Sequence, residues 1–257
     1  YDEQVWEEEE EEEEDEDLRY DGEEGYLRED EIDGEWHQDT DVDQREGSEA
    51  RAVAQNEDDA EPSPKVWRWY TCMQKPFKRH PLFDKMLARI LEQDPRGVLL
   101  LHGTPGNPEA GKIMRTRLTK AGVDMSRVHF LPPQPHHALM ALYALSDVVL
   151  DSYYAGGCTT TREALEVGAP VVTLPAKYLG GRWSLAYYQI MGMAARGQWL
   201  VARNKLDYVA TAIKVAKNEG GFRDRVVQKI MENIGKLFRQ EAAVEGWSAL
   251  LERLAAV

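Results

Sequence analysis

The chain has 257 residues, enough for one large domain or two small ones, and a formal net charge of −15 at pH 7. This charge divides sharply, because residues 1–65 hold 30 acidic against 5 basic residues, whereas residues 66–257 hold 16 against 26 and so carry a net charge of +10. Two cysteines exclude a disulfide framework and a cysteine-based zinc site, and no apolar run is long enough to cross a membrane.

The first 65 residues form an acidic, low-complexity segment that includes an unbroken run of glutamates from Glu7 to Glu14. This composition offers too few apolar side chains to offset the conformational entropy that folding removes, so we predict that residues 1–65 are disordered. Residues 66–257 are predicted to form the folded domain. Its net charge of +10 favours anionic ligands, either nucleotide phosphates or nucleic acid.

From residue 66 onward, short apolar runs typical of buried strands alternate with segments whose apolar residues recur at helical spacing. The predicted strands cover residues 66–72, 97–101, 127–131, 148–150, 171–174 and 198–202. The predicted helices cover residues 80–92, 108–121, 135–145, 182–193, 205–217, 222–238 and 241–255, and one more opens at Thr159 or Thr160. This alternation predicts an α/β fold, a Rossmann-like doubly wound parallel sheet with helices on both faces. Ligands of such sheets bind at the carboxyl ends of the strands, so the loops that follow the strands should converge.

The loop after the first predicted strand contains Gln74 and Lys78. A lysine at the mouth of a crevice can neutralise a diphosphate as a compact point charge. If the diphosphate is a leaving group, Lys78 would stabilise the transition state most, because the negative charge grows there. The alternative is a solvated lysine in front of a helix.

The next two loops exclude some nucleotide sites and favour another. The sequence HGTPGNP at residues 102–108 lacks the spacing of a P-loop and of a G-x-G-x-x-G dinucleotide site, which argues against an ATPase and a dehydrogenase. The sequence LPPQPHH at residues 131–137 is held extended by its prolines, which leaves carbonyl groups free to hydrogen-bond the edge of a nucleobase. His136 and His137 have no recognisable nucleophile or carboxylate partner by spacing, so a helix start is their simpler interpretation.

Residues 146–175 have the pattern of a strand, a turn, a helix and a strand. A glycine pair that ends at Gly157 allows a close turn, and Thr159 or Thr160 can cap the following helix. The first turn of that helix would present backbone N–H groups and a positive dipole end to an anion. Glu163, one turn further, is suited to accept hydrogen bonds from sugar hydroxyls. The alternative is an ordinary βαβ unit whose threonines merely cap a helix.

Four segments of the folded part carry a resemblance to a known family. They are YTCMQKPFKRHP at residues 70–81, FLPPQP at 130–135, the segment 146–175, and GGRWSLAYYQIMG at 180–192. In this order and spacing they resemble the nucleotide-sugar-binding half of GT-B glycosyltransferases, and more narrowly the C-terminal catalytic lobe of the O-linked N-acetylglucosamine transferase and SPINDLY family. The chain departs from that pattern at Cys158 and Leu139, where the family often has histidine.

The resemblance implies roles for individual residues. It places Lys78 on the diphosphate as the residue needed for turnover, with Gln74 beside it as a polar contact. It places Pro133 and Gln134 at the base and His136 near the ribose. The third motif would contribute the groups around the phosphates and the ribose, which are Gly157, Cys158, Thr159, Thr160 and Glu163.

These roles predict the nucleotide-sugar-binding part of an inverting, metal-independent glycosyltransferase. Its donor would be a UDP-sugar or GDP-sugar, it would need no cofactor, and it would transfer a GlcNAc-like sugar to serine or threonine of an acceptor protein. The N-terminal catalytic lobe of such an enzyme is missing from these residues. The alternatives are a non-catalytic nucleotide-binding or interaction module with an acidic arm, and a nucleotide-sugar epimerase. Nucleic-acid binding through the basic surface is less favoured. The presence of only two cysteines fits a protein of a reducing compartment, the cytoplasm or the nucleus.

Overall fold

The computed structural model describes residues 67–195, 199–238 and 241–255. The predicted acidic segment, residues 1–65, lies outside the described residues, so its disorder and the domain boundary at residue 65 stay predictions. Within the described ranges, no helix has the length and the apolar character that a membrane crossing requires.

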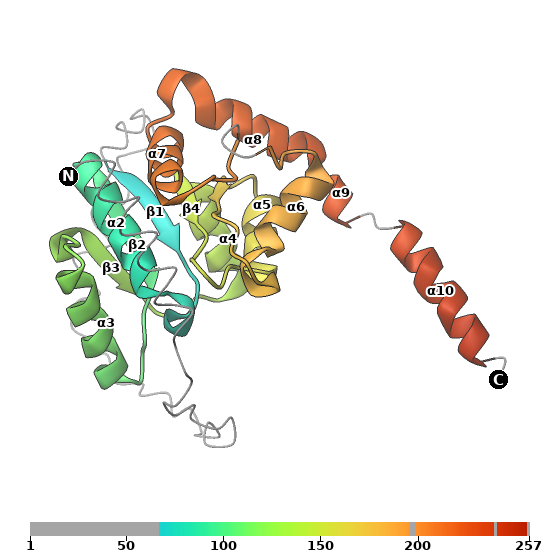
Figure 1. Ribbon diagram of the computed structural model, residues 1–257, viewed down its shortest axis with the longest axis horizontal. Coiled ribbons are helices and arrows are strands. Elements are labelled where there is room, and N and C mark those ends of the chain that lie inside the picture. Colours follow the sequence, from blue (N-terminus) through green and yellow to red (C-terminus); the bar gives the residue numbers. More distant parts are fainter. Residues whose placement is uncertain (1–66, 196–198, 239–240, 256–257) are drawn as a thin grey trace, which may run out of the picture. The chain divides into compact units, whose positions relative to one another are not determined.

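Five parallel strands form one sheet in the order β3-β2-β1-β4-β5 (Figure 1). The strands are β1 Arg68–Cys72, β2 Gly97–His102, β3 Val128–Leu131, β4 Val148–Leu150 and β5 Val171–Val172. Tyr70 of the central strand β1 lies opposite Leu99 of β2 on one side and Val148 of β4 on the other. The strand order runs outward from β1 to β3 and then crosses to β4, so the topological switch point lies between β1 and β4. This confirms the predicted Rossmann-like doubly wound sheet.

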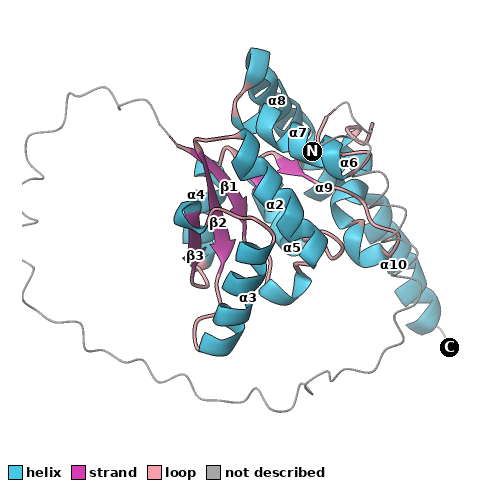
Figure 2. Ribbon diagram, turned by 60° about the vertical axis from the view of Figure 1, so that its left-hand side comes forward, coloured by secondary structure: helices cyan, strands magenta, loops and turns pink. Residues whose placement is uncertain are grey.

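Helices connect the strands and cover both faces of the sheet. They are α2 Pro81–Gln93, α3 Pro108–Lys120, α4 His136–Leu145, α5 Thr159–Glu166, α6 Trp183–Met191, α7 Lys205–Ala216, α8 Phe222–Asn233, α9 Gly235–Phe238 and α10 Glu241–Ala255. Short 3-10 helices are η2 Pro76–Lys78, η3 Met125–Arg127, η4 Leu179–Gly181 and η5 Glu219–Gly221. Helices α2 and α4 lie on opposite sides of the sheet (Figure 2), as right-handed crossovers on the two sides of the switch point require.

The core lies between the sheet and its helices. All of β4 and most of β2 are buried, as the unbroken apolar runs of these parallel strands predict. Helix α2 packs an apolar stripe at helical spacing into the same core, namely Leu82, Phe83, Met86, Leu87, Ile90 and Leu91. Each such side chain contributes about 1.5–3 kcal/mol when it is fully buried. This packing fixes the start of α2 and therefore the loop before it, which carries Lys78.

Three predictions for the C-terminal third were wrong in detail, although the helices predicted at 182–193, 205–217 and 241–255 are present as α6, α7 and α10. The predicted strand 198–202 is represented in the described residues by one isolated bridge, between Thr173 and Val201, because Thr173 exchanges hydrogen bonds with Leu200 and Ala202 beyond the end of β5. The predicted strand 171–174 shortens to β5, because its partner β4 ends at Leu150, which lies opposite Val172. The predicted helix 222–238 is divided between α8 and α9 just before Gly235, a residue of low helix propensity.

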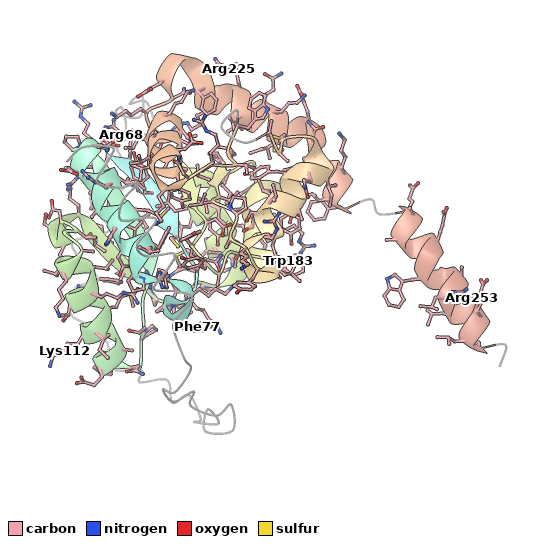
Figure 3. The ribbon with its side chains drawn as sticks, viewed as in Figure 1. Arg68, Phe77, Lys112, Trp183, Arg225 and Arg253 are labelled. Atoms are coloured by element: carbon pink, nitrogen blue, oxygen red, sulfur yellow. The ribbon has the colours of Figure 1, made fainter. Side chains whose placement is uncertain are left out.

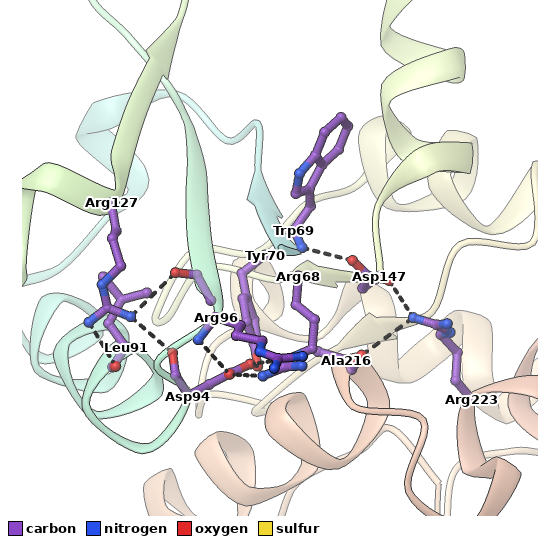
Figure 4. Close-up of polar contacts among 11 residues, drawn as sticks. Arg68, Trp69, Tyr70, Leu91, Asp94, Arg96, Arg127, Asp147, Ala216 and Arg223 are labelled. Atoms are coloured by element: carbon purple, nitrogen blue, oxygen red, sulfur yellow. Dashed lines mark hydrogen bonds and ion pairs between the residues drawn. The ribbon is translucent and has the colours of Figure 1, made fainter. Parts of the chain in front are cut away.

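Asp94, which follows α2, fixes the start of β1 (Figure 4). Its buried carboxylate accepts hydrogen bonds from Arg68 Nε at 2.6 Å, from the Tyr70 hydroxyl at 2.7 Å and from the Arg96 amide at 3.1 Å. Burial alone would raise the pKa of Asp94, but the hydrogen bonds from Arg68 and Tyr70 outweigh it and hold the pKa below its usual value.

Asp94→Asn is expected to lower the free energy of unfolding by about 2 kcal/mol at neutral pH, because bonds to a charged acceptor become bonds to a neutral one. The folded-state pKa of Asp94 is depressed, so its contribution is complete above the ordinary value of 3.8 and is lost as the pH falls through the folded-state pKa. Urea unfolding at neutral and at acidic pH measures both effects, with the exposed Asp224→Asn as control. Equal stability of the Asp94 variant and the wild type at neutral pH would contradict this account.

Candidate functional site

Lys78, Gln74 and Thr160 form one connected set of hydrogen bonds at the carboxyl ends of β1 and β4. Gln74 and Lys78 lie in the loop after β1, where Pro76 opens the short helix η2 that ends at Lys78. Lys78 Nζ donates to Gln74 Oε1 at 3.2 Å and to the Gly156 carbonyl oxygen at 3.1 Å. Gln74 Nε2 donates to Thr160 Oγ1 at 2.6 Å. The structure therefore brings the predicted lysine and the predicted threonine together at the switch point.

A two-glycine turn brings the start of α5 close to Gln74. A methyl group added at Gly157 would lie 2.4 Å from Thr161 Oγ1 and 2.5 Å from Gln74 Nε2. A methyl group at Gly156 would lie 2.9 Å from both carboxylate oxygens of Asp151. Only residues without Cβ fit this turn, which confirms the predicted close turn at the glycine pair.

Asp151, the residue after β4, anchors the glycine turn. Its buried carboxylate accepts hydrogen bonds from the Gly157 amide at 2.7 Å, the Ser184 hydroxyl at 2.6 Å and the Thr173 hydroxyl at 2.8 Å. Burial raises the pKa of Asp151, and these three bonds, with Lys78 nearby, oppose the rise. The sequence predictions did not include Asp151 among the site residues. A carboxylate directly after a buried apolar strand is the feature that could have identified it.

The start of α5 corrects the capping prediction. The expected cap was Thr159 or Thr160, but α5 begins at Thr159, and the residue in the capping position is Cys158, which makes no side-chain capping bond. The helix starts this early because the chain adopts helical conformation directly after the glycine turn and Cys158. Thr159 is exposed, and the Thr160 hydroxyl accepts from Gln74 instead. The first-turn amides of α5 therefore lack a side-chain cap and suit an anion.

Tyr187 of α6 lies beside Cys158. Its hydroxyl donates to the Cys158 carbonyl oxygen at 3.3 Å and lies 3.4 Å from the Cys158 sulfur. Burial, with the contact to Cys158, raises the pKa of Tyr187 to about 12, so the hydroxyl keeps its proton at neutral pH. Sequence reasoning assigned Tyr187 no role, although it lies within the fourth motif.

The residues predicted to surround the base and the ribose come from α5, the start of α4 and the loop before it. Pro133 is exposed, and Gln134 Nε2 donates to the Pro132 carbonyl oxygen at 2.9 Å. His136 Nε2 lies 3.4 Å from Glu163 Oε1 of α5, an ion pair when the histidine is protonated. The structure therefore brings His136 and Glu163 together, as their predicted positions at one ribose require.

Metal ligands are not grouped in the described part of the chain. Across residues 67–195, 199–238 and 241–255, no cluster of three or more His, Cys, Asp or Glu side chains is placed to hold a metal ion. The expectation that the reaction needs no metal and no cofactor stays a prediction.

The model of glycosyl transferase family 41 matches residues 64–241. A protein of Solanum lycopersicum named "Probable UDP-N-acetylglucosamine--peptide N-acetylglucosaminyltransferase SPINDLY" is 32% identical over 143 residues, which cover 54% of this chain and 15% of that protein. The chain therefore spans a small part of the length of this curated relative.

Two solved structures share the fold. An O-GlcNAc transferase mutant from Thermobaculum terrenum superposes with a TM-score of 0.62 at 26% identity, over 76% of this chain and 36% of that chain. Sucrose-phosphate synthase from Thermosynechococcus elongatus superposes with a TM-score of 0.53 at 19% identity, over 74% of this chain and 46% of that chain. The second likeness concerns the fold alone.

Proposed function

Because the chain belongs to glycosyl transferase family 41, we propose that its described lobe is the nucleotide-sugar-binding half of an inverting glycosyltransferase. The fold of this lobe is that of one Rossmann-like GT-B lobe. The donor is a UDP-sugar, and the name of the tomato relative favours N-acetylglucosamine as the sugar. The acceptor is a serine or threonine hydroxyl of a protein. In this proposal a second lobe supplies the acceptor surface and the catalytic base.

The observation that carries the proposal is the set of hydrogen bonds from Lys78 through Gln74 to Thr160. It places an ammonium group beside the start of α5, at the switch point between β1 and β4. An ammonium group and unpaired helix amides both favour a diphosphate, and neither favours a neutral ligand. Glu163, paired with His136 one turn into α5, suits the ribose hydroxyls beside that diphosphate.

The same groups support sugar transfer. The acceptor oxygen attacks the anomeric carbon from the face opposite the nucleotide, and the bond from that carbon to the β-phosphate oxygen breaks. The hydroxyl proton leaves to the base of the second lobe, and the electron pair of the broken bond stays on the diphosphate. Lys78 and the α5 amides then stabilise the charge that grows on this leaving group. In this proposal they take the role that a bound divalent cation has in other glycosyltransferases.

Isothermal titration with UDP, GDP and AMP tests the nucleotide site. UDP is expected to bind in the micromolar range and more tightly than AMP, because only the two diphosphates reach both Lys78 and α5. Thr160→Val keeps the shape but removes the hydroxyl that accepts from Gln74, so UDP affinity is expected to fall about 5- to 10-fold.

The control is Thr119→Val, which changes an exposed threonine of α3 and should leave UDP affinity unaltered. Absence of binding to all three nucleotides would refute the transferase site and favour an interaction module. Tighter binding of GDP than of UDP would overturn the proposed donor but not the diphosphate site.

A further inference from the structure

The buried guanidinium of Arg79 is only partly hydrogen-bonded. Arg79 is 2% exposed, and its Nη2 donates to the His102 carbonyl oxygen at 2.7 Å and lies 2.9 Å from the Met114 sulfur. Its Nε and Nη1 have no hydrogen-bond partner among the residues that the structure describes. The carboxylate of Asp84 attracts the Arg79 cation electrostatically, but it accepts its hydrogen bond from Arg117. A buried cation with two nitrogens that lack hydrogen-bond partners is costly, which indicates an anionic partner from outside the described chain.

A cavity of about 540 Å³ lies between α3 and the loops that follow β2 and β3. Met114 forms part of its wall, and the sulfur of the same side chain contacts Arg79, so Arg79 lies behind this wall. Phe130, Leu131 and several prolines make most of the remaining wall apolar. Met114 is unbranched and flexible, so it is the side chain most able to turn aside and expose the guanidinium.

Two exposed basic residues of α3, Lys112 and Arg115, also line the cavity. The Arg115 guanidinium lies over the Phe130 ring at 4.4 Å from its centroid, which holds this cation at the rim. The acidic residue of α3, Glu109, is not among the lining residues. The cavity therefore combines apolar walls with cations at its rim and behind one wall.

The cavity lies at the same edge of the sheet as the proposed nucleotide site but uses different residues. Leu131 and Pro132 line the cavity and directly precede residues 133–134, the predicted base loop. Figure 3 shows Lys112 at the end of the molecule where Phe77, in the loop after β1, also lies. A ligand in the cavity would therefore lie beside the nucleotide rather than in its place.

We propose that this cavity binds an acidic segment of the acceptor protein. One carboxylate enters beside Met114 and pairs with Arg79, and neighbouring carboxylates pair with Lys112 and Arg115. Apolar side chains of the same segment contact the Phe130 wall. A free phosphate ion would leave most of a 540 Å³ apolar-walled cavity unfilled, which favours a peptide. The identification of this peptide as acceptor rests on the proposed function.

Fluorescence anisotropy with a labelled peptide of alternating aspartate and leucine tests this site, with a twin peptide that carries asparagine for aspartate. At low salt the acidic peptide is expected to bind at least about tenfold more tightly than its twin. Arg79→Met and the double variant Lys112→Gln/Arg115→Gln should each weaken its binding about tenfold. The matched control Lys120→Gln/Lys217→Gln removes the same charge from exposed positions elsewhere and should have less than about a twofold effect.

Equal binding of the two peptides, or equal losses in the rim and control double variants, would overturn the proposal. Arg79→Met removes a buried charge with unpaired N–H groups, so thermal unfolding should show a fold at least as stable as the wild type. If that variant fails to fold, the rim double variant decides the question. The peptide assay contains no nucleotide, so failure of UDP to bind the wild type would refute the proposed function and leave the acidic-peptide site standing.

Discussion

Gly157→Ala is expected to weaken UDP binding by at least about 100-fold, because the added methyl group does not fit the turn before α5. The added carbon would lie 2.4 Å from Thr161 Oγ1, 2.5 Å from Gln74 Nε2 and 2.9 Å from Thr160 Oγ1. Two helix residues and the buried Gln74 would have to move together. The move breaks the bond from Gln74 to Thr160 and displaces the first-turn amides of α5, so the two halves of the diphosphate site separate.

The matched control is Gly180→Ala, because a methyl group there has no neighbour within 4 Å and Gly180 lies in the turn before α6. Titration with UDP measures the effect, and thermal unfolding of both variants shows whether the sheet persists. The core of the sheet does not depend on this turn, so Gly157→Ala should stay folded. UDP binding by that variant within about threefold of the wild type would show that the glycine turn does not shape the nucleotide site.

The parallel sheet could be predicted from the sequence because its buried strands appear as unbroken apolar runs. Val148 to Leu150 is buried throughout, and a side chain on either face of the sheet meets a helix. Residues 198–202 show where the same reasoning fails. A short apolar run near a sheet edge pairs only if a neighbouring strand continues far enough, and β5 ends at Val172. Pattern alone cannot show how far a neighbour extends.

The site was predictable to the level of loops and of the resemblance, but not to the level of hydrogen bonds. Strand-end reasoning placed Lys78 and the segment before α5 at one edge, and the structure joins them through Gln74. The capping prediction failed because threonine is a common cap, whereas a one-residue shift of the helix start gives that position to Cys158. Asp151 was missed because its partners Thr173 and Ser184 come from later elements of the chain.

Lys78→Met is expected to weaken UDP binding about 30- to 150-fold, because it removes a charge-assisted hydrogen bond to the diphosphate worth about 2–3 kcal/mol. Uridine has no phosphate, so its affinity should stay unchanged. The ratio of the UDP and uridine dissociation constants therefore isolates the contribution of the ammonium group. Titration of both ligands into the wild type and the variant measures it.

The matched control is Lys75→Met, which removes the same charge from an exposed residue of the same loop, where Lys75 Nζ lies 5.9 Å from the centroid of the Phe77 ring. General attraction of anions by the basic lobe would make both variants lose UDP affinity equally, and that result would contradict a specific diphosphate contact. Lys78→Arg tests the geometry, because the compact ammonium fits between Gln74 and the Gly156 carbonyl oxygen whereas the wider guanidinium does not.

A loss of affinity for UDP but not for uridine would also indicate how Lys78 contributes to sugar transfer. Lys78 would then act on the diphosphate, whose charge increases as the bond to the sugar breaks, so its removal should slow sugar transfer more than it weakens donor binding. Joined to the second lobe and assayed for transfer, Lys78→Met should therefore lower kcat and not only raise KM for the donor. A variant that raises KM alone would show that Lys78 holds the donor without stabilising the departure of the diphosphate.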